Sequence, residues 1–150
     1  MGNRKRKAAR WQEAAEKRNR EPFFPLRYDV LRSPVIQTLS GNAVKLLAYL
    51  MAQYNGYNNG DLSATDKGTA EAGAFKSTAT LAKAKRELLE SGLIAVSRQG
   101  GKNQCTLYAL TFLAIDDCGG KLDMGETRRA PDDWKRRHYE LSPAPQLKQH

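Results

Sequence analysis

Hydroxyl-bearing and cationic side chains are concentrated in one short stretch near the middle of the chain. The residues concerned are Lys76, Ser77, Thr78, Thr80, Lys83 and Arg86. Hydroxyl groups and cations both donate hydrogen bonds to anionic oxygen atoms, and the first turn of a helix adds free backbone N–H groups. The chemistry of this stretch therefore suits phosphate, and Ser and Thr hydroxyls also suit the polar edges of nucleic-acid bases.

A second, smaller group of such side chains surrounds two adjacent glycines. Arg98, Lys102 and Asn103 flank Gly100 and Gly101. Glycine has no side chain and tolerates positive φ, so a glycine loop can turn tightly and approach another molecule closely. We expect residues 99–103 to form the tip of a β-hairpin that contacts a nucleic-acid backbone.

The basic stretch is expected to lie on a well-defined helix. Ser77 is a good N-cap, and Gly92 is suited to end the helix in the left-handed conformation. Apolar residues recur at helical spacing and predict a buried side formed by Leu81, Ala84, Leu88 and Leu89. Lys83 and Arg86 fall on the opposite side, where they face solvent or a ligand.

Other elements follow from capping residues and periodicity. Ser40 is expected to cap a helix with a wide apolar stripe, and Ser63 a weak second helix that runs to about Ala72. Strands are expected at Leu93–Arg98 and Gln104–Leu113, on either side of the glycine loop. A short helix opened by Ser33 and Pro34, ending near Thr38, precedes them all.

This order of elements predicts an α+β fold, a winged helix-turn-helix. It would contain three main helices and a two- to three-stranded β-hairpin wing, within a domain spanning residues 22–118. Residues 1–21 are expected to be a flexible basic arm, and residues 119–150 a flexible polar tail, mostly unstructured. The basic helix would enter a DNA major groove, and the wing would lie beside it.

Charge is distributed unevenly along the chain. The net charge is +9. Residues 1–21 carry eight Lys and Arg against three Glu, a net +5, whereas residues 22–118 and 119–150 each carry a net +2. A basic arm beside a nearly neutral domain is a common arrangement in proteins that bind polyanions. The alternative is a solvated arm that only aids solubility.

The return strand is apolar on both faces, because Tyr108, Leu110 and Phe112 alternate with a second apolar row. The arm, the tail or a partner protein must cover the second face. This leaves an alternative function open. The domain would then be a protein-interaction adaptor that docks a replication or packaging partner.

Several segments resemble one family. They are Leu39-Ser40, Tyr54-Asn55-Gly56, residues 58–63, 77–81, 87–94, 98–101, 107–111 and 115–118. Together they resemble small phage- and prophage-encoded helix-turn-helix proteins over about residues 23–118. The resemblance implies a winged-helix fold, a bacterial or phage setting, and a role in replication initiation or regulation. Gly68 and Thr69, inside the expected second helix, depart from the family's richer pattern.

Enzyme chemistry is not expected. No phosphate-binding loop of the GxxxxGK[ST] type is present, and the acidic pairs Asp116-Asp117 and Asp132-Asp133 lie where surface residues are usual. Cys105 and Cys118 form no CxxC pair and are expected to be free thiols. We therefore predict no catalytic, cofactor-binding or metal-binding residues, and no apolar run reaches membrane-spanning length.

The sequence thus predicts a cytoplasmic, nucleoid-associated protein of a bacterial host cell that binds double-stranded DNA. It would act in phage or mobile-element replication or in transcription regulation. A homodimer on two half-sites, and contact with a replication or transcription protein, are both compatible with this pattern.

Overall fold

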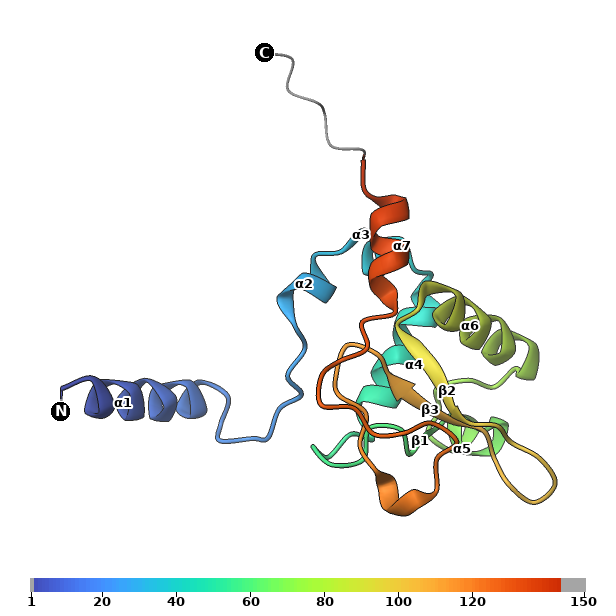
Figure 1. Ribbon diagram of the computed structural model, residues 1–150, viewed down its shortest axis with the longest axis horizontal. Helices are drawn as coiled ribbons and strands as arrows, with labels where there is room; N and C mark the ends of the chain where they lie inside the picture. The colour runs from blue at the N-terminus through green and yellow to red at the C-terminus, as the bar shows by residue number, and fades with distance from the viewer. Residues whose placement is uncertain (1, 144–150) are drawn as a thin grey trace, which may run out of the picture.

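The structure is a computed structural model that describes residues 2–143 (Figure 1). Its helices are α1 (Gly2–Lys17), α2 (Tyr28–Leu31), α3 (Pro34–Gln37), α4 (Gly41–Met51), α5 (Asp66–Glu71), α6 (Thr78–Ser91), the 3-10 helix η1 (Cys118–Gly120) and α7 (Trp134–Leu141). Its strands are β1 (Leu62–Ser63), β2 (Ile94–Arg98) and β3 (Leu107–Leu110). The molecule is therefore mixed α+β, as the sequence predicted at this coarse level.

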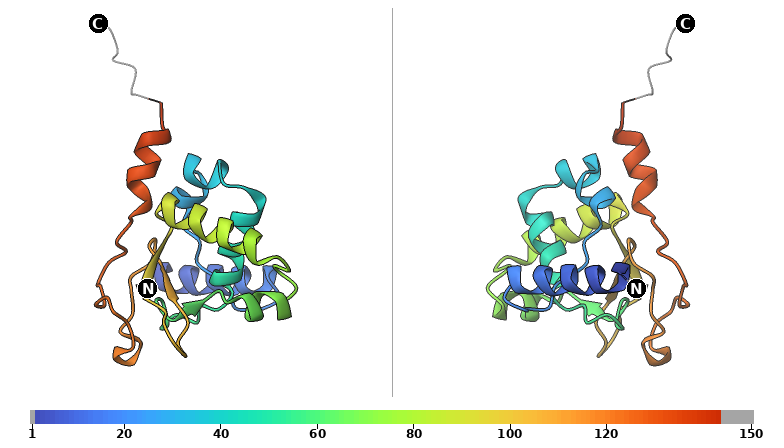
Figure 2. Two further views of the ribbon diagram at one scale, coloured as in Figure 1. Left: turned by 90° about the vertical axis from the view of Figure 1, so that its right-hand side faces the viewer. Right: turned by 90° about the vertical axis from the view of Figure 1, so that its left-hand side faces the viewer.

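The three strands form one antiparallel sheet in the order β1-β3-β2. Leu62 pairs with Tyr108, and Ile94 pairs with Leu110. The register shifts between Val96 and Arg98, which places a bulge at that point. Helices α4, α5 and α6 cover one face of the sheet, and the segment leading to α7 runs along the other (Figure 2).

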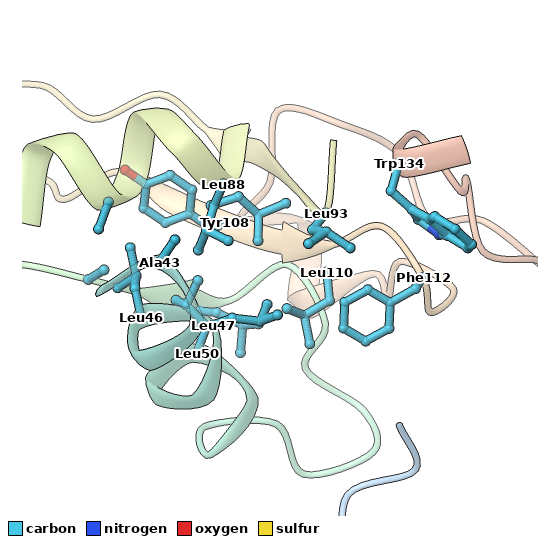
Figure 3. Close-up of a cluster of buried hydrophobic side chains, with 14 of the residues drawn as sticks. Ala43, Leu46, Leu47, Leu50, Leu88, Leu93, Tyr108, Leu110, Phe112 and Trp134 are labelled. Carbon is cyan, nitrogen blue, oxygen red and sulfur yellow. The ribbon is translucent and has the colours of Figure 1, made fainter. Parts of the chain in front are cut away.

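The core lies between α4, α6 and the sheet (Figure 3). The Ser40 hydroxyl accepts the Ala43 N–H, so the predicted N-cap of α4 is confirmed. The helix buries four residues of its apolar stripe, Ala43, Leu46, Leu47 and Leu50, but Val44, which the stripe also placed in the core, is exposed. Each buried leucine stabilises the fold by about 1.5–3 kcal/mol.

Helix α6 begins and ends as the sequence predicted. Ser77 is its N-cap, and Gly92 ends it with φ of 79°. A Cβ at Gly92 would also lie 2.7 Å from the Asp133 backbone oxygen, so packing as well as φ requires glycine. Leu81, Ala84 and Leu88 are buried, but Leu89 is exposed at the edge of the helix. The expected buried side was therefore too wide by one residue.

Helix α5 is shorter than the sequence predicted, and its N-cap is two residues later. Thr65, not Ser63, accepts the Gly68 N–H, at 2.9 Å. Ser63 is instead a residue of β1 and pairs with Leu107. Pairing with the return strand holds Ser63 in an extended conformation. The start of α5 is thus set by this long-range contact and not by the local capping propensity of Ser63.

The segment after residue 118 differs most from expectation. The sequence predicted a flexible, mostly unstructured tail, but its described part contains η1 and α7, and Trp134 is only 2 % exposed. Backbone bonds tie it to the sheet: Asp123 N–H donates to Ser97 O, and Asp132 N–H donates to Thr111 O, both at 2.8 Å. The tail prediction also included residues 144–150, which lie outside the described residues.

Both faces of the return strand are covered: Tyr108 and Leu110 lie in the core with α4 and α6, and Leu107 and Ala109 on the other side are buried as well. Strand β3 is shorter than the predicted 104–113, yet Leu110 and Phe112 are almost fully buried. Trp134 belongs to the same apolar cluster as Phe112, and Phe24 stacks edge-on against Phe112 with ring centroids 6.3 Å apart. The chain itself therefore covers the face that the sequence left open.

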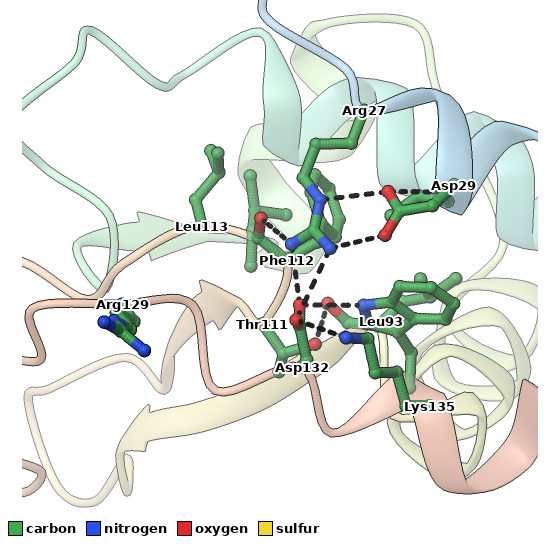
Figure 4. A network of polar contacts seen from close by, with 12 residues as sticks. Arg27, Asp29, Leu93, Thr111, Phe112, Leu113, Arg129, Asp132 and Lys135 are labelled. Carbon is green, nitrogen blue, oxygen red and sulfur yellow. Dashed lines mark hydrogen bonds and ion pairs between the residues drawn. The ribbon is translucent and has the colours of Figure 1, made fainter.

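A network of ion pairs and hydrogen bonds joins the start of the domain to this C-terminal segment (Figure 4). We call this network, formed by Arg27, Asp29, Asp132 and Lys135, the clasp. Arg27 Nη1 donates to Asp132 Oδ1 at 2.7 Å and to Phe112 O at 3.0 Å. Hydrogen bonds to Asp29 and then to Asp132 raise the pKa of Arg27. Burial raises the pKa of Asp132, but hydrogen bonds from Arg27, Lys135 and Trp134 outweigh it and hold that pKa below its ordinary value.

Asn59 is a buried hydrogen-bonding centre beneath the loop after β3. Its Nδ2 donates to the carbonyl oxygens of Leu110, Leu113 and Ala114, and its Oδ1 accepts the Leu110 N–H at 2.8 Å. One amide side chain thus satisfies backbone groups that would otherwise be buried without partners.

Helix α1 stands apart from the rest. None of its residues is buried, and the ribbon shows it projecting from the domain (Figure 1). None of the helices in residues 2–143 has the length and apolar character needed to cross a membrane.

Candidate nucleic-acid interface

The N-terminal end of α6 presents the hydroxyl groups that the sequence singled out. Lys76, Ser77 and Thr78 are exposed. The Ser77 hydroxyl accepts the Thr80 N–H at 3.3 Å, which leaves its own proton free to donate. The first backbone N–H groups of a helix have no partner within the helix. This end can therefore donate several hydrogen bonds to an anion.

Packing fixes which side of α6 faces outward. Leu81, Ala84 and Leu88 anchor the helix in the core, so Lys83 and Arg86 are held on the opposite, exposed side. The helix cannot rotate this side inward without exposing its leucines. The orientation of the two cations is thus a property of the fold.

The outer side of α6 keeps a positive excess, because Lys83 and Arg86 outnumber Glu90, the one carboxylate of the helix that lies on that side. Glu87 turns away toward α4, where its two carboxylate oxygens accept the backbone N–H and the hydroxyl of Ser40, each at 2.6 Å. In the described part of the chain, Lys76, Lys83 and Arg86 form no ion pair. Their cationic groups are available to a ligand.

Thr80 is less accessible than the rest of the predicted set. It is half-buried on the flank of α6, whereas Ala79 and Ala82 are exposed beside Lys83. Only part of the Thr80 side chain can meet a ligand. The small Ala side chains leave the helix surface open to close approach.

The β2–β3 hairpin ends in a two-residue turn. Gly101 and Gln104 exchange backbone hydrogen bonds of 2.9 and 3.2 Å, which leaves Lys102 and Asn103 at the tip. Asn103 has φ of 64°, a left-handed conformation that asparagine tolerates. Both tip residues are exposed, and the hairpin projects beyond the sheet (Figure 1). The tip is thus placed for contact with a ligand.

Arg98 differs from the other predicted contacts, because it braces the hairpin. It is half-buried, and its Nη2 donates to Cys105 O at 2.9 Å. Its buried Nε has no hydrogen-bond partner among residues 2–143. We therefore assign Arg98 to the support of the hairpin more than to its contact surface.

The two glycines of the loop have different roles. A Cβ at Gly100 would lie 2.5 Å from Thr106 Oγ1, so packing within the hairpin excludes a side chain there. A Cβ at Gly101 would meet nothing within 4 Å. The sequence predicted that both glycines allow close approach to a groove, but Gly100 is needed by the hairpin itself.

The predicted residues lie on one side of the domain. Helix α6 and the hairpin tip both face the right-hand side of Figure 1, with α5 between them. In the left view of Figure 2, α6 crosses the front of the molecule. The exception to this grouping is the basic arm, because α1 lies on the opposite side.

The support of this surface was not visible in the sequence. Asn59 and the pair Arg27 and Asp132 join segments 51 to 105 residues apart. Asn next to Gly is a common turn signal, and Arg and Asp are common surface residues, so neither pattern distinguishes these positions.

Residues 2–143 contain no cluster of three or more His, Cys, Asp or Glu that could hold a metal ion.

Comparisons with models of known protein families, with curated proteins and with solved structures found no match to this chain.

Proposed function

We propose that residues 22–118 form a winged helix-turn-helix domain that binds double-stranded DNA. The order α4-β1-α5-α6-β2-β3, with the strand order β1-β3-β2, supports this reading. In such domains the second helix of the helix-turn-helix enters the major groove. Here that helix is α6, and the hairpin tip is the wing.

One observation carries the proposal. The outer side of α6 holds Lys83 and Arg86 exposed and without ion pairs in the described structure, while Glu87 is drawn away toward α4. Glu90 is the one carboxylate of α6 on that side, so the two cations leave a positive excess there. A cationic surface of this kind attracts phosphates and releases their counterions on binding.

The contacts divide into two kinds. Lys83, Arg86 and Lys102 suit phosphates, because they are cations on exposed surfaces with no fixed partner among the described residues. Ser77 and Thr78, at the end of α6 that enters a groove first, suit base edges. The first group would contribute affinity, and the second would contribute preference among sequences.

The test is duplex binding by the full chain, measured by fluorescence anisotropy against salt concentration. Replacing Lys83 and Arg86 by Ala should weaken binding to every duplex by about tenfold or more and reduce the salt slope by about 2. Ser77→Thr should instead change the preference among duplexes selected from a random pool.

Arg128 and Arg129 provide a matched control. Both are exposed and precede α7, on the face of the sheet away from α6 (Figure 2). Replacing both by Ala removes the same charge from the chain. If this pair weakened duplex binding as much as the α6 pair, general charge and not the outer side of α6 would account for binding.

We further propose that the DNA-binding activity serves phage or mobile-element replication or transcription regulation, in the cytoplasm of a bacterial host. The adaptor alternative rested on an uncovered face of the return strand. That face lies in the core, where Tyr108 and Leu110 pack with α4 and α6, so it offers no docking surface.

A further inference from the structure

Helix α1 is a basic helix without a place in the fold. Its 16 residues contain six Lys and Arg, and no residue of α1 is buried. The largest apolar side chain, Trp11, is 69 % exposed. Helices of this length are marginal in water unless something packs against them. The domain supplies no such packing, so the partner that would order α1 must be another molecule.

The cations of α1 form a stripe. Spacings of three, four and seven residues place Arg6, Arg10 and Lys17 on one side of the helix together with one carboxylate, Glu13, and with Lys7 next to them. No ion pair of the described chain involves these four side chains, and Glu16 pairs with Arg20 outside the helix. The cations on this side outnumber Glu13, so the side attracts phosphates.

The other side of α1 does not favour a lipid surface or a protein groove. It carries Ala8, Ala15 and Trp11 as its apolar residues. One large side chain buries too little apolar area for stable insertion into a membrane interface. The chemistry of this helix is therefore that of a polyanion binder.

The attachment of α1 places it away from α6. The chain first enters the core at Phe24, whose ring packs edge-on against Tyr54 at 5.6 Å. Residues 18–23 are the tether, and six residues span at most about 20 Å. A domain of this size is about 35 Å across. The tether therefore keeps the C-terminal end of α1 within about 20 Å of Phe24, and α1 lies on the side of the domain opposite α6 (Figures 1 and 2).

We propose that α1 binds a second segment of duplex DNA, so that one chain holds two duplexes at once. The inference rests on the proposed function, because the first duplex is the one held by α6. The stripe of Arg6, Arg10 and Lys17 would bind the phosphates of the second duplex. Ordering of α1 would accompany that contact, as in other basic segments that fold on binding.

The experiment is a capture assay with the full chain at about 0.15 M salt. A biotinylated duplex on beads is loaded with protein and washed, and a fluorescent duplex is then added. The wild-type chain should retain the fluorescent duplex. The variant R6Q/R10Q should keep its binding to the first duplex but retain at least about fivefold less of the second. Gln is chosen because it preserves helix propensity.

Arg128→Gln with Arg129→Gln is the matched control, and it should leave capture unchanged. Capture by R6Q/R10Q equal to the wild type at the same loading would overturn the inference, since bridging would then come from paired chains. Normal binding of the first duplex by the wild type without capture of the second would overturn the inference alone.

Two further outcomes are decisive. If the wild type does not bind the first duplex, the proposed function fails and this inference fails with it. If capture is absent while the wild type, but not R6Q/R10Q, binds vesicles containing phosphatidylserine, α1 is a membrane-surface helix and the inference is wrong.

Discussion

Helices α6 and α1 are both basic, but the molecule positions them in different ways. Helix α6 buries Leu81 and Leu88, so the direction of its cations is set by the core. Helix α1 buries nothing, and its direction is set only by a short tether. Net charge alone would make the arm the stronger candidate for binding a polyanion, since residues 1–21 carry +5. Packing against the core fixes the positions of the cations on a helix, and of these two helices only α6 is packed in this way.

The largest expected difference between the two helices is in stability. Leu88→Ala should lower the free energy of unfolding by about 3 kcal/mol, because it opens a cavity in the core. Trp11→Ala should change it by less than about 0.5 kcal/mol, because Trp11 contacts little. Urea unfolding of the two variants measures both values. A destabilisation of 2 kcal/mol or more by Trp11→Ala would show that α1 packs on the domain.

The hairpin should behave like α6, as a positioned element. Gly100→Ala forces a Cβ against the Thr106 backbone and hydroxyl, and we expect it to cost about 2 kcal/mol. Gly101→Ala meets open space and should cost less than about 0.5 kcal/mol. Thermal unfolding compares the pair. Equal effects would mean that the close contact at Gly100 does not exist.

The N-cap of α6 gives a smaller effect. Ser77→Ala removes the acceptor of the Thr80 N–H and should cost about 1 kcal/mol of stability. Ser77→Asp keeps a capping oxygen, so it should restore stability while weakening duplex binding through its negative charge. Unfolding and anisotropy measured on the same two variants separate capping from contact with DNA.

The smallest expected effect is that of acid on the C-terminal clasp. The folded pKa of Asp132 lies below its ordinary value of 3.8, so its ionised form stabilises the fold above about pH 4. That contribution is lost as the pH falls through the folded pKa. In a Trp11→Phe variant, Trp134 is the only tryptophan, and its emission should stay constant from pH 7 to about 4 and shift to the red below it.

Replacing the carboxylate tests the same point at neutral pH. Asp132→Asn should produce the red shift of Trp134 in part, because Asn binds Arg27 and Lys135 without charge. If the emission wavelength of Trp134 changes neither with pH nor with this substitution, the clasp does not hold α7.

Local signals in the sequence were sufficient for part of this fold. Ser40, Ser77 and Gly92 predicted helix ends correctly, because a cap acts on residues three or four positions away. The outward direction of Lys83 and Arg86 followed from the leucines on the other side. The winged-helix assignment and the DNA contacts themselves stay predictions.

The rest depended on contacts between distant segments. The polar residues around Trp134 predicted a loose tail, and only its place in the core cluster with Phe112 shows why it is buried. The role of Asn59 is decided by carbonyl groups 51 to 55 residues away. The support role of Arg98 follows from Cys105 across the hairpin, whereas its charge alone suggested a contact residue.

The most direct test of the central claim is an NMR titration of the isotopically labelled full chain with one short duplex. If α6 and the hairpin tip hold the duplex, backbone amide signals of residues 76–86 and 102–103 shift with added duplex, at concentrations where those of residues 121–133 do not. Shifts confined to residues 2–17, with α6 and the hairpin tip unchanged, would contradict it.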